Sequence, residues 1–356
     1  MTSAADPPVG TDRRRLVLGT VAAGAKVAVG GSVLASIPVS AAQPAGRSGC
    51  VPATFWQPLL ADRDRGAAHW LSWMAALRRL GVTRLIVQHS ALEPYDVLLP
   101  GAAPDDAGRR LLADLLAAAR RHGVQVWMGL SYDPAHFEAV AADDPSRVQA
   151  YLQMRLQRMR RVVALLSPSM RHPSVRGWYL SDEIDDLSWA SVSRGELLRS
   201  WLAEATAQLR AAAPNARIAV SGFVNARQTT PADLAQQWQR WFEAAPALDE
   251  LLFQDGVGAG KVPLDQSAAY LAAVAEVARR ARRRFTPVVE LFEAADAAAT
   301  GNGWRAAPFE RVARQIAIAR STARSWAAFS VPEYAGPETP GSRALRDGLG
   351  ARCAVG

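Results

Sequence analysis

Short apolar runs alternate with amphipathic stretches along the chain from residue 53 onward. The runs are rich in Val, Ile, Leu and aromatic residues, which is typical of buried strands. Eight of them predict strands: Ala53–Pro58, Arg84–Ala91, Gln125–Tyr132, Val175–Glu183, Ala216–Phe223, Glu250–Gly258, Pro287–Ala295 and Ser325–Tyr334. Their starts are 31, 41, 50, 41, 34, 37 and 38 residues apart. Because each interval holds a strand and a crossover helix, the pattern predicts a parallel sheet.

The stretches between these strands carry the start and stop signals of helices. His69–Leu80 has one apolar face and stops at Gly81, and the next helix stops in the same way at Gly123. Asp144-Pro145 and Thr230-Pro231 combine a cap residue with a proline and predict helix starts. Four more helices are predicted: Arg194–Ala213, Leu264–Arg284, Phe309–Ala323 and Arg343–Leu349.

Eight strand-helix units without a polar linker predict a single domain over residues 53–356, an α/β fold of the closed (β/α)8 barrel type. An open, doubly wound sheet is the alternative. That fold favours a glycine-rich turn after the first strand, where this chain has Trp56-Gln57-Pro58.

The first 42 residues differ from the rest and predict an export signal. Arg13-Arg14-Arg15 precede a weakly hydrophobic, Gly- and Ala-rich stretch, and Ser40-Ala41-Ala42 is a candidate cleavage site. This pattern resembles a twin-arginine signal, followed by a short segment over residues 43–52. Lys26 and the glycines disfavour the alternative of an uncleaved membrane anchor. We therefore expect a periplasmic or extracellular protein with no stable membrane span once the signal is removed.

The chain is basic, with a formal net charge of +8 over 356 residues. Only Lys26 and Lys261 are lysines among its 41 basic residues, and the arginines are scattered along the predicted helices. Nucleic-acid binding requires a basic patch and a recognisable module, and the sequence contains no such module, so no nucleic-acid partner is expected. An acidic polymer stays open as a ligand.

Cys50 and Cys353 are the two cysteines of the chain, one at each end of the predicted domain. In an exported barrel the first strand starts, and the last helix ends, at the same face, so a disulfide between them is expected. No cluster with metal-ligand spacing is present in the sequence. We expect neither a metal nor another cofactor.

Polar and aromatic residues stand at the ends of all eight predicted strands, whereas the strand bodies are apolar. In a closed barrel these ends converge on one bowl. Aromatic rings beside amides and carboxylates favour a sugar-binding cleft, because apolar sugar faces stack on rings and hydroxyls need fixed partners. The predicted substrate contacts are Trp56, Gln57, Gln88, Tyr132, Asp182, Asn225, Gln254, Asp255 and Glu333.

The densest chemistry lies in Arg176–Asp186, where an apolar strand ends in Ser181-Asp182-Glu183. Glu183 ends the fourth strand and Glu290 lies near the end of the seventh. Cleavage of a glycosidic bond needs one carboxyl group as acid and another as nucleophile or base. Alternatively, Asp185 and Asp186 are helix caps, Asp182 and Glu183 are solvated loop acids, and Glu290 is a buried acid paired with arginine. Glu293 competes with Glu290 for the nucleophile's role.

Other chemistries are less well supported. The chain has no G-x-S-x-G elbow. The Asp255–Lys261 loop lacks the first glycine and the Ser/Thr of a phosphate loop. A Schiff base on Lys261 or a divalent cation on Asp182, Asp185 and Asp186 is a weaker alternative. We expect His89 to form a local hydrogen bond and to have no catalytic role.

Six segments, FWQP, LIVQ, GWYLSDEIDD, LFQDGVG, VVELFE and AFSVPEY, occur in this order over residues 53–335. Together they resemble an uncharacterised exported bacterial family, domain of unknown function 4434, which is similar to clan A (β/α)8 glycoside hydrolases. The resemblance implies a retaining mechanism with Glu183 as acid/base and Glu290 as nucleophile. Glu183 is then expected to have the higher pKa of the two, and the carboxyl groups to lie about 5–5.5 Å apart.

These patterns together favour an exported glycoside hydrolase that cleaves a polysaccharide. The contrasting hypothesis is a non-catalytic barrel that binds polysaccharide within an export or cell-surface assembly.

Overall fold

Eight parallel strands close into a barrel in the computed structural model, which describes residues 50–101, 103, 106–295, 303–337, 339 and 341–355. The barrel strands are β1 (Ala53–Trp56), β2 (Arg84–Val87), β4 (Gln125–Gly129), β6 (Val175–Ile184), β7 (Arg217–Gly222), β8 (Glu250–Gln254), β9 (Arg284–Glu290) and β12 (Ala327–Phe329). Their order around the barrel is β1-β12-β9-β8-β7-β6-β4-β2. The predicted single (β/α)8 barrel is confirmed, and the predicted export signal lies outside the described residues.

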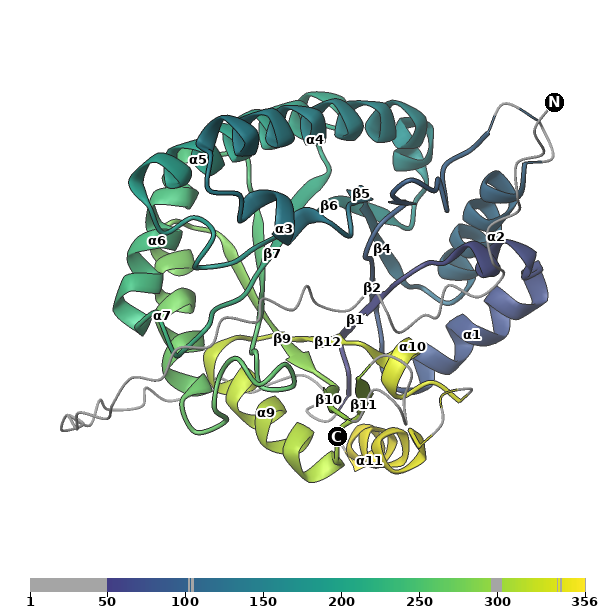
Figure 1. The fold of residues 1–356 in the computed structure, drawn as a ribbon. Helices are drawn as coiled ribbons and strands as arrows, with labels where there is room; N and C mark the ends of the chain where they lie inside the picture. The colour runs from purple at the N-terminus through teal and green to yellow at the C-terminus, as the bar shows by residue number, and fades with distance from the viewer. Residues whose placement is uncertain are drawn as a thin grey trace.

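Helices surround the barrel (Figure 1). They are α1 (Ala67–Arg79), α2 (Ala107–Arg121), α3 (His136–Val140), α4 (Pro145–Leu166), α5 (Val192–Ala212), α6 (Pro231–Ala244), α7 (Ser267–Arg280), α9 (Phe309–Thr322), α10 (Val331–Tyr334) and α11 (Arg343–Val355), with the 3-10 turns η1 (Leu60–Asp64) and η2 (Ser167–Arg171). Asp144 and Thr230 cap α4 and α6, and a proline follows each of them, as predicted. The Asp144 and Thr230 side chains accept hydrogen bonds from backbone N–H groups of the first turn, which have no partner within the helix.

Aromatic side chains fill the barrel interior. The ring of Phe55 lies 5.5 Å from that of Tyr179 and 5.4 Å from that of Phe329, measured between centroids. The Tyr179 hydroxyl donates to Ser221 Oγ at 2.8 Å, so its polar atom is satisfied inside the core. The centre of the barrel is therefore filled with side chains, and a substrate could bind only at the strand ends.

Several predicted strands divide at the barrel rim. Ala91–Leu92 (β3) and Ser131–Tyr132 (β5) form a separate two-stranded sheet, and Phe292–Ala294 (β10) pairs with Trp304–Ala306 (β11). The predicted strand over Ser325–Tyr334 was wrong beyond Phe329. Ser330 instead caps the one-turn helix α10, in which Pro332 occupies the first turn.

The predicted disulfide between Cys50 and Cys353 is present, with the two Cα atoms 4.2 Å apart. Gly81, at the end of α1, lies directly beneath it with φ of +87°. A Cβ at this position would lie 2.8 Å from Cys50 Sγ, so both the left-handed backbone and the contact require glycine.

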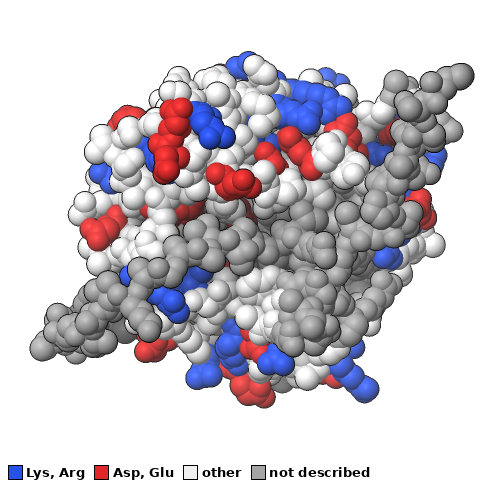
Figure 2. All heavy atoms as spheres, viewed as in Figure 1, with Lys and Arg blue, Asp and Glu red and all other residues white. Residues whose placement is uncertain are grey.

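Acidic and basic side chains are interspersed on the molecular face shown in Figure 2. Among the helices that the structure describes, none has the length and apolar character needed to cross a bilayer.

Candidate active site

Glu183 and Glu290 stand where β6 and β9 end, at the barrel face that carries the loops following the strands. Both side chains are buried. The pairing of β6 with β7 shifts register between Leu180 and Ile184, so the segment that carries Glu183 departs from the regular ladder. The sequence prediction that these two strands deliver carboxylates to one face therefore agrees with the geometry.

Two amide side chains hold Glu183. Gln254 Nε2 at the end of β8 donates to Glu183 Oε1 at 2.8 Å, and Gln88 Nε2 after β2 donates to the same oxygen at 3.4 Å. Burial raises the pKa of Glu183 to about 7, against the opposing effects of Lys261 and the two amides. The sequence had predicted Gln88 and Gln254 as substrate contacts. They lie in the site, beside Glu183.

A backbone loop holds Glu290. The Ala259 N–H donates to Glu290 Oε2 at 2.7 Å, and a Cβ on Gly258 would lie 2.8 Å from Glu290 Cβ. Only glycine at position 258 lets the loop approach this closely. Glu290 Oε1 is buried and accepts no hydrogen bond from any residue that the structure describes. The competing Glu293 lies in β10 and pairs with Arg305 at 2.8 Å.

Asp255, at the end of β8, is a second buried carboxyl group whose charge acts on Glu290. It accepts hydrogen bonds from Gln315 Nε2 at 2.7 Å and from the Val257 N–H at 3.2 Å. Burial raises the pKa of Asp255, and burial together with the Asp255 charge raises the pKa of Glu290. Both proposed catalytic carboxyl groups therefore have a raised pKa, and the predicted order, with Glu183 the higher, stays a prediction.

Lys261 is the site residue that the sequence interpretation undervalued. Its ammonium nitrogen lies 3.4 Å from the centroid of the Phe223 ring, in the electrostatic field of Glu290 and Glu183. A signal was available, since Lys261 is the only lysine after residue 26 in a chain of arginines. Lys261 lies several residues after the end of β8 in the sequence, so we had not expected it in the site. The loop nevertheless brings its side chain back to Phe223.

Asp182 forms a buried ion pair that the sequence did not reveal. Its two carboxylate oxygens lie 2.8 Å and 3.2 Å from Arg155 Nη2 and Nε, and Arg155 Nη1 also pairs with Glu93 at 2.5 Å. Arg155 comes from α4 and is almost fully buried. This pairing fixes the end of β6 next to Glu183, and a sugar would have to share Asp182 with it.

The remaining predicted contacts do not all face the carboxylate pair. Burial, and after it the charge of Glu183, raises the pKa of Tyr132. Glu333 Oε1 accepts the Gln57 N–H at 3.1 Å. Trp56 instead packs on Trp70 of α1, with ring centroids 5.1 Å apart, and is buried there. Its ring is directed away from the Glu183–Glu290 pair because neighbouring strand residues face opposite ways and Phe55 points inward.

Asp185, Asp186 and Asn225 organise the loops after β6 and β7. Asp185 Oδ1 accepts the backbone N–H groups of Leu187 and Ser188, and Asp186 Oδ1 accepts that of Asn225 at 2.9 Å. Asp185 thus caps a turn, whereas helix α5 is capped by Ser191. Within the described ranges, no three His, Cys, Asp or Glu side chains are arranged to hold a metal ion.

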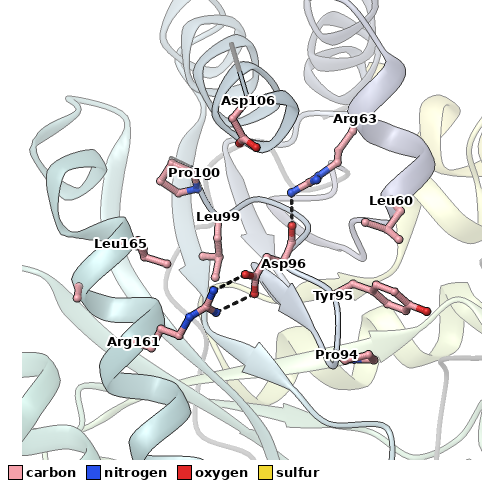
Figure 3. Close-up of a pocket in the computed structure, with 12 residues that line it drawn as sticks. Leu60, Arg63, Pro94, Tyr95, Asp96, Leu99, Pro100, Asp106, Arg161 and Leu165 are labelled. Atoms are coloured by element: carbon pink, nitrogen blue, oxygen red, sulfur yellow. Dashed lines mark hydrogen bonds and ion pairs between the residues drawn. The ribbon is translucent and has the colours of Figure 1, made fainter. Parts of the chain in front are cut away.

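A separate cavity of about 690 Å³ lies between η1, the β3–α2 connection and α4 (Figure 3). Its charged side chains are paired with protein groups: Arg161 Nη1 contacts Asp96 Oδ1 at 2.9 Å, and Arg63 Nε donates to the Val97 carbonyl at 2.9 Å. Glu183 and Glu290 do not line it. The carboxylate pair therefore remains the candidate centre.

A family model described as a domain of unknown function, DUF4434, matches residues 51–344. The chain belongs to the DUF4434 family. The uncharacterized protein YbcH of Escherichia coli K12 is 28% identical over 224 residues, which cover 62% of this chain and 70% of YbcH. Membership in DUF4434 confirms the resemblance inferred from the six segments.

Solved structures similar to this DUF4434 chain include glycoside hydrolases. A proposed α-L-fucosidase from Bacteroides thetaiotaomicron VPI-5482 is 15% identical with a TM-score of 0.69, covering 90% of this chain and 98% of its own. The endo-1,4-β-mannanase of Rhizomucor miehei is 10% identical with a TM-score of 0.56, covering 86% and 95%. At these identities the likeness establishes the shared barrel fold and leaves the activity to be argued from the site.

Proposed function

We propose that this protein is a retaining glycoside hydrolase that cleaves a polysaccharide, with Glu183 as acid/base and Glu290 as nucleophile. The observation that carries the proposal is a pair of buried carboxyl groups at the ends of β6 and β9, on the barrel face that carries the loops following the strands. Each group is held through one oxygen by amide or backbone donors, Glu183 through Oε1 and Glu290 through Oε2. The other oxygen of each is left for a substrate.

The proposed reaction has two steps. The Glu290 carboxylate attacks the anomeric carbon while Glu183 gives its proton to the leaving oxygen, so the glycosidic bond breaks and a glycosyl ester forms. Glu183, now ionised, then takes a proton from water as that water attacks the anomeric carbon and releases Glu290. The same carboxyl group therefore acts first as an acid and then as a base.

Substrate recognition is proposed for the polar groups around the pair. Gln88, Gln254 and Tyr132 come from three different elements near Glu183, so they could contact hydroxyls on different sides of one sugar. The fucosidase and mannanase neighbours support carbohydrate as the substrate class, since this fold hosts such chemistry in them. We propose that the protein acts outside the cytoplasm, which the disulfide and the export-like first 42 residues support.

The decisive experiment is a polysaccharide panel assayed for new reducing ends with the wild-type protein and with Glu183→Gln and Glu290→Gln. Loss of more than about 100-fold in rate is expected for both variants, because each removes a group needed in the transition state. Glu293→Gln is the matched control, since Glu293 is paired with Arg305 outside the proposed pair and should keep its rate. Full activity in Glu290→Gln would remove Glu290 from the chemistry.

Product stereochemistry tests the mechanism separately. The first-formed anomer, followed by NMR, should keep the configuration of the substrate, as a glycosyl-enzyme intermediate requires. An inverted product would contradict the retaining assignment. Binding of a polysaccharide without any turnover, unchanged in Glu183→Gln, would favour the non-catalytic binding barrel instead.

A further inference from the structure

The loop between β8 and α7 brings two different groups to Glu290. The Ala259 N–H donates to Glu290 Oε2 at 2.7 Å, and Lys261 follows two residues later. The loop is closed on itself by the Lys261 N–H, which donates to the Gly256 carbonyl at 2.9 Å, and the Lys261 carbonyl accepts the Ala226 N–H at 3.1 Å. The backbone of Lys261 is thus fixed on both sides, to its own loop and to the loop after β7.

The ammonium group of Lys261 lies on an aromatic ring and forms no direct ion pair with any residue that the structure describes. Its nitrogen is 3.4 Å from the centroid of the Phe223 ring. No carboxylate oxygen among the described residues lies within 4.0 Å of it, although it sits in the field of Glu290 and Glu183. A cation held by a ring keeps its charge near the carboxylates without occupying their oxygens.

The charges facing Lys261 come from several elements. Glu183 ends β6, Asp185 and Asp186 follow that strand, and Glu290 ends β9. The charges of Asp255 at the end of β8 and of Arg311 from α9 also act on Glu290. Arg311 is partly engaged elsewhere, because it donates to the Phe292 carbonyl and lies 3.7 Å from Glu293. Lys261 is therefore the cation that the two proposed catalytic carboxyl groups share.

Resting on the proposed hydrolase function, we propose that Lys261 is the positioning residue that favours the ionised form of Glu290 inside the barrel, and that Phe223 holds its charge in place. With Asp255 beside it, Glu290 would otherwise carry a second negative charge in a buried site, which is unfavourable. A direct Lys261–Glu290 ion pair would relieve this cost but would block the oxygen that must reach the substrate. The ring-held cation supplies the charge and leaves Glu290 Oε1 open.

The test is the pH dependence of kcat/KM for the wild-type protein, Lys261→Met and Lys261→Arg. Removing the charge should move both limbs of the profile to higher pH by about one unit or more, the effect typical of an opposite charge at about 4–6 Å. Below the acid limb this shift gives a loss of about tenfold in kcat/KM. Lys261→Arg should restore the wild-type limbs, and Phe223→Leu should shift them partway.

The exposed Arg279→Met variant on α7 is the matched control for the loss of one positive charge, and its limbs should stay in place. A lower rate in Lys261→Met with unmoved limbs would overturn the proposal, since a purely structural role predicts that result. So would a higher KM with unchanged limbs, which would instead make Lys261 a substrate contact.

A second measurement does not depend on activity. Carboxyl carbons of 13C-labelled glutamate are titrated by NMR in wild-type protein and in Lys261→Met, with Glu183→Gln and Glu290→Gln used to assign the two signals. Both pKa values should rise in Lys261→Met, and unchanged values would refute the inference. If the values rise although no polysaccharide is cleaved, the charge role stands and the hydrolase function fails.

Discussion

Glu183 is a buried acid whose ionised form costs free energy, and this cost links the site to stability. Burial raises its pKa from 4.5 to about 7. A group whose pKa is raised on folding stabilises the protein below its unfolded pKa, and that contribution is lost as the pH rises through the folded value. The free energy of unfolding should therefore fall between about pH 5 and pH 8.

Glu183→Gln should remove part of this pH dependence. We expect the drop in unfolding free energy between pH 5 and pH 8, measured by urea denaturation, to be smaller than in the wild type by roughly 2 kcal/mol. Glu293→Gln provides the comparison, because Glu293 is paired with Arg305 nearer the surface. Equal pH dependence in Glu183→Gln and wild type would show that burial does not perturb this carboxyl group.

His89 is a buried histidine with a local partner, as the sequence predicted. Its Nε2 lies 2.8 Å from the Pro58 carbonyl, and burial lowers its pKa to about 4, so the ring is neutral at neutral pH. His89→Ala should lose less than about 100-fold in rate, the scale of general-base catalysis. It should also unfold more easily by about 1–3 kcal/mol, because the Pro58 carbonyl loses its donor. A larger rate loss in a folded variant would make His89 a catalytic residue.

At the scale of elements, the first residues of β2 and β8 are joined across the barrel end opposite the candidate site. Arg84 Nη1 and Nη2 contact the two Glu250 carboxylate oxygens at 2.6 Å and 2.9 Å, and Thr286 of β9 donates to Glu250 at 2.6 Å. The guanidinium also lies 3.9 Å from the centroid of the Trp127 ring. The Arg84–Glu250 ion pair and its neighbours thus connect the four strands β2, β4, β8 and β9.

Glu250→Ala should therefore destabilise the barrel strongly, by about 3–5 kcal/mol, because it leaves Arg84 buried without its counter-charge. The double variant Arg84→Met/Glu250→Leu should recover much of that loss, since it leaves no buried charge. Chemical denaturation of the two variants and the wild type measures both values. A double variant as unstable as Glu250→Ala would mean that shape, rather than charge, decides this contact.

The sequence predicted the elements that hydrophobic spacing defines and failed where side chains from distant segments decide. Each of the barrel strands was found because its body is apolar and its spacing regular. The turn of α10 was missed because Ser330 caps a helix within an apolar run, AFSVPEY. The Arg155–Asp182 pair could not be predicted, because α4 and β6 meet only in the fold and many arginines could have filled that role.

The site was predicted in the same uneven way. Glu183, Gln88 and Gln254 were proposed because they stand at strand ends, and position along a barrel strand sets which end of the barrel a residue lies at. The same reasoning placed Trp56 in the cleft, whereas its side chain packs against α1. Neighbouring residues of a strand point to opposite sides, so a shift of one residue moves a side chain from the barrel interior to the helix layer. The position of Lys261 could not be predicted, because it depends on the conformation of the loop between β8 and α7, which residue spacing does not reveal.

At the scale of the whole molecule, a covalent bond joins the two ends of the described chain. Cys50 and Cys353 are 303 residues apart in sequence, and Val51 donates to the Leu80 carbonyl at 2.9 Å beside them. Cys50 lies just before β1, at the barrel end where the strands begin. The bond therefore constrains the closure of the barrel at the end opposite Glu183 and Glu290.

Cys50→Ser/Cys353→Ser should lose stability while keeping its activity below the unfolding transition. In the chain-entropy description, closing a loop of this length stabilises the folded state by up to about 4–5 kcal/mol, less any strain. Urea denaturation with and without dithiothreitol measures the effect. The wild-type midpoint should fall on reduction, whereas that of the double-serine variant should not respond, which separates loss of the bond from a general effect of the reductant.

Because the bond lies away from the strand ends that carry the carboxyl groups, kcat/KM on a cleaved polysaccharide should change by less than about threefold, well below the scale of a lost catalytic group. A midpoint that is insensitive to reduction in the wild type would show that the helices α9 and α11 hold the barrel closed without the disulfide. A collapse of activity in folded double-serine protein would show that this end of the barrel shapes the site through the length of the strands.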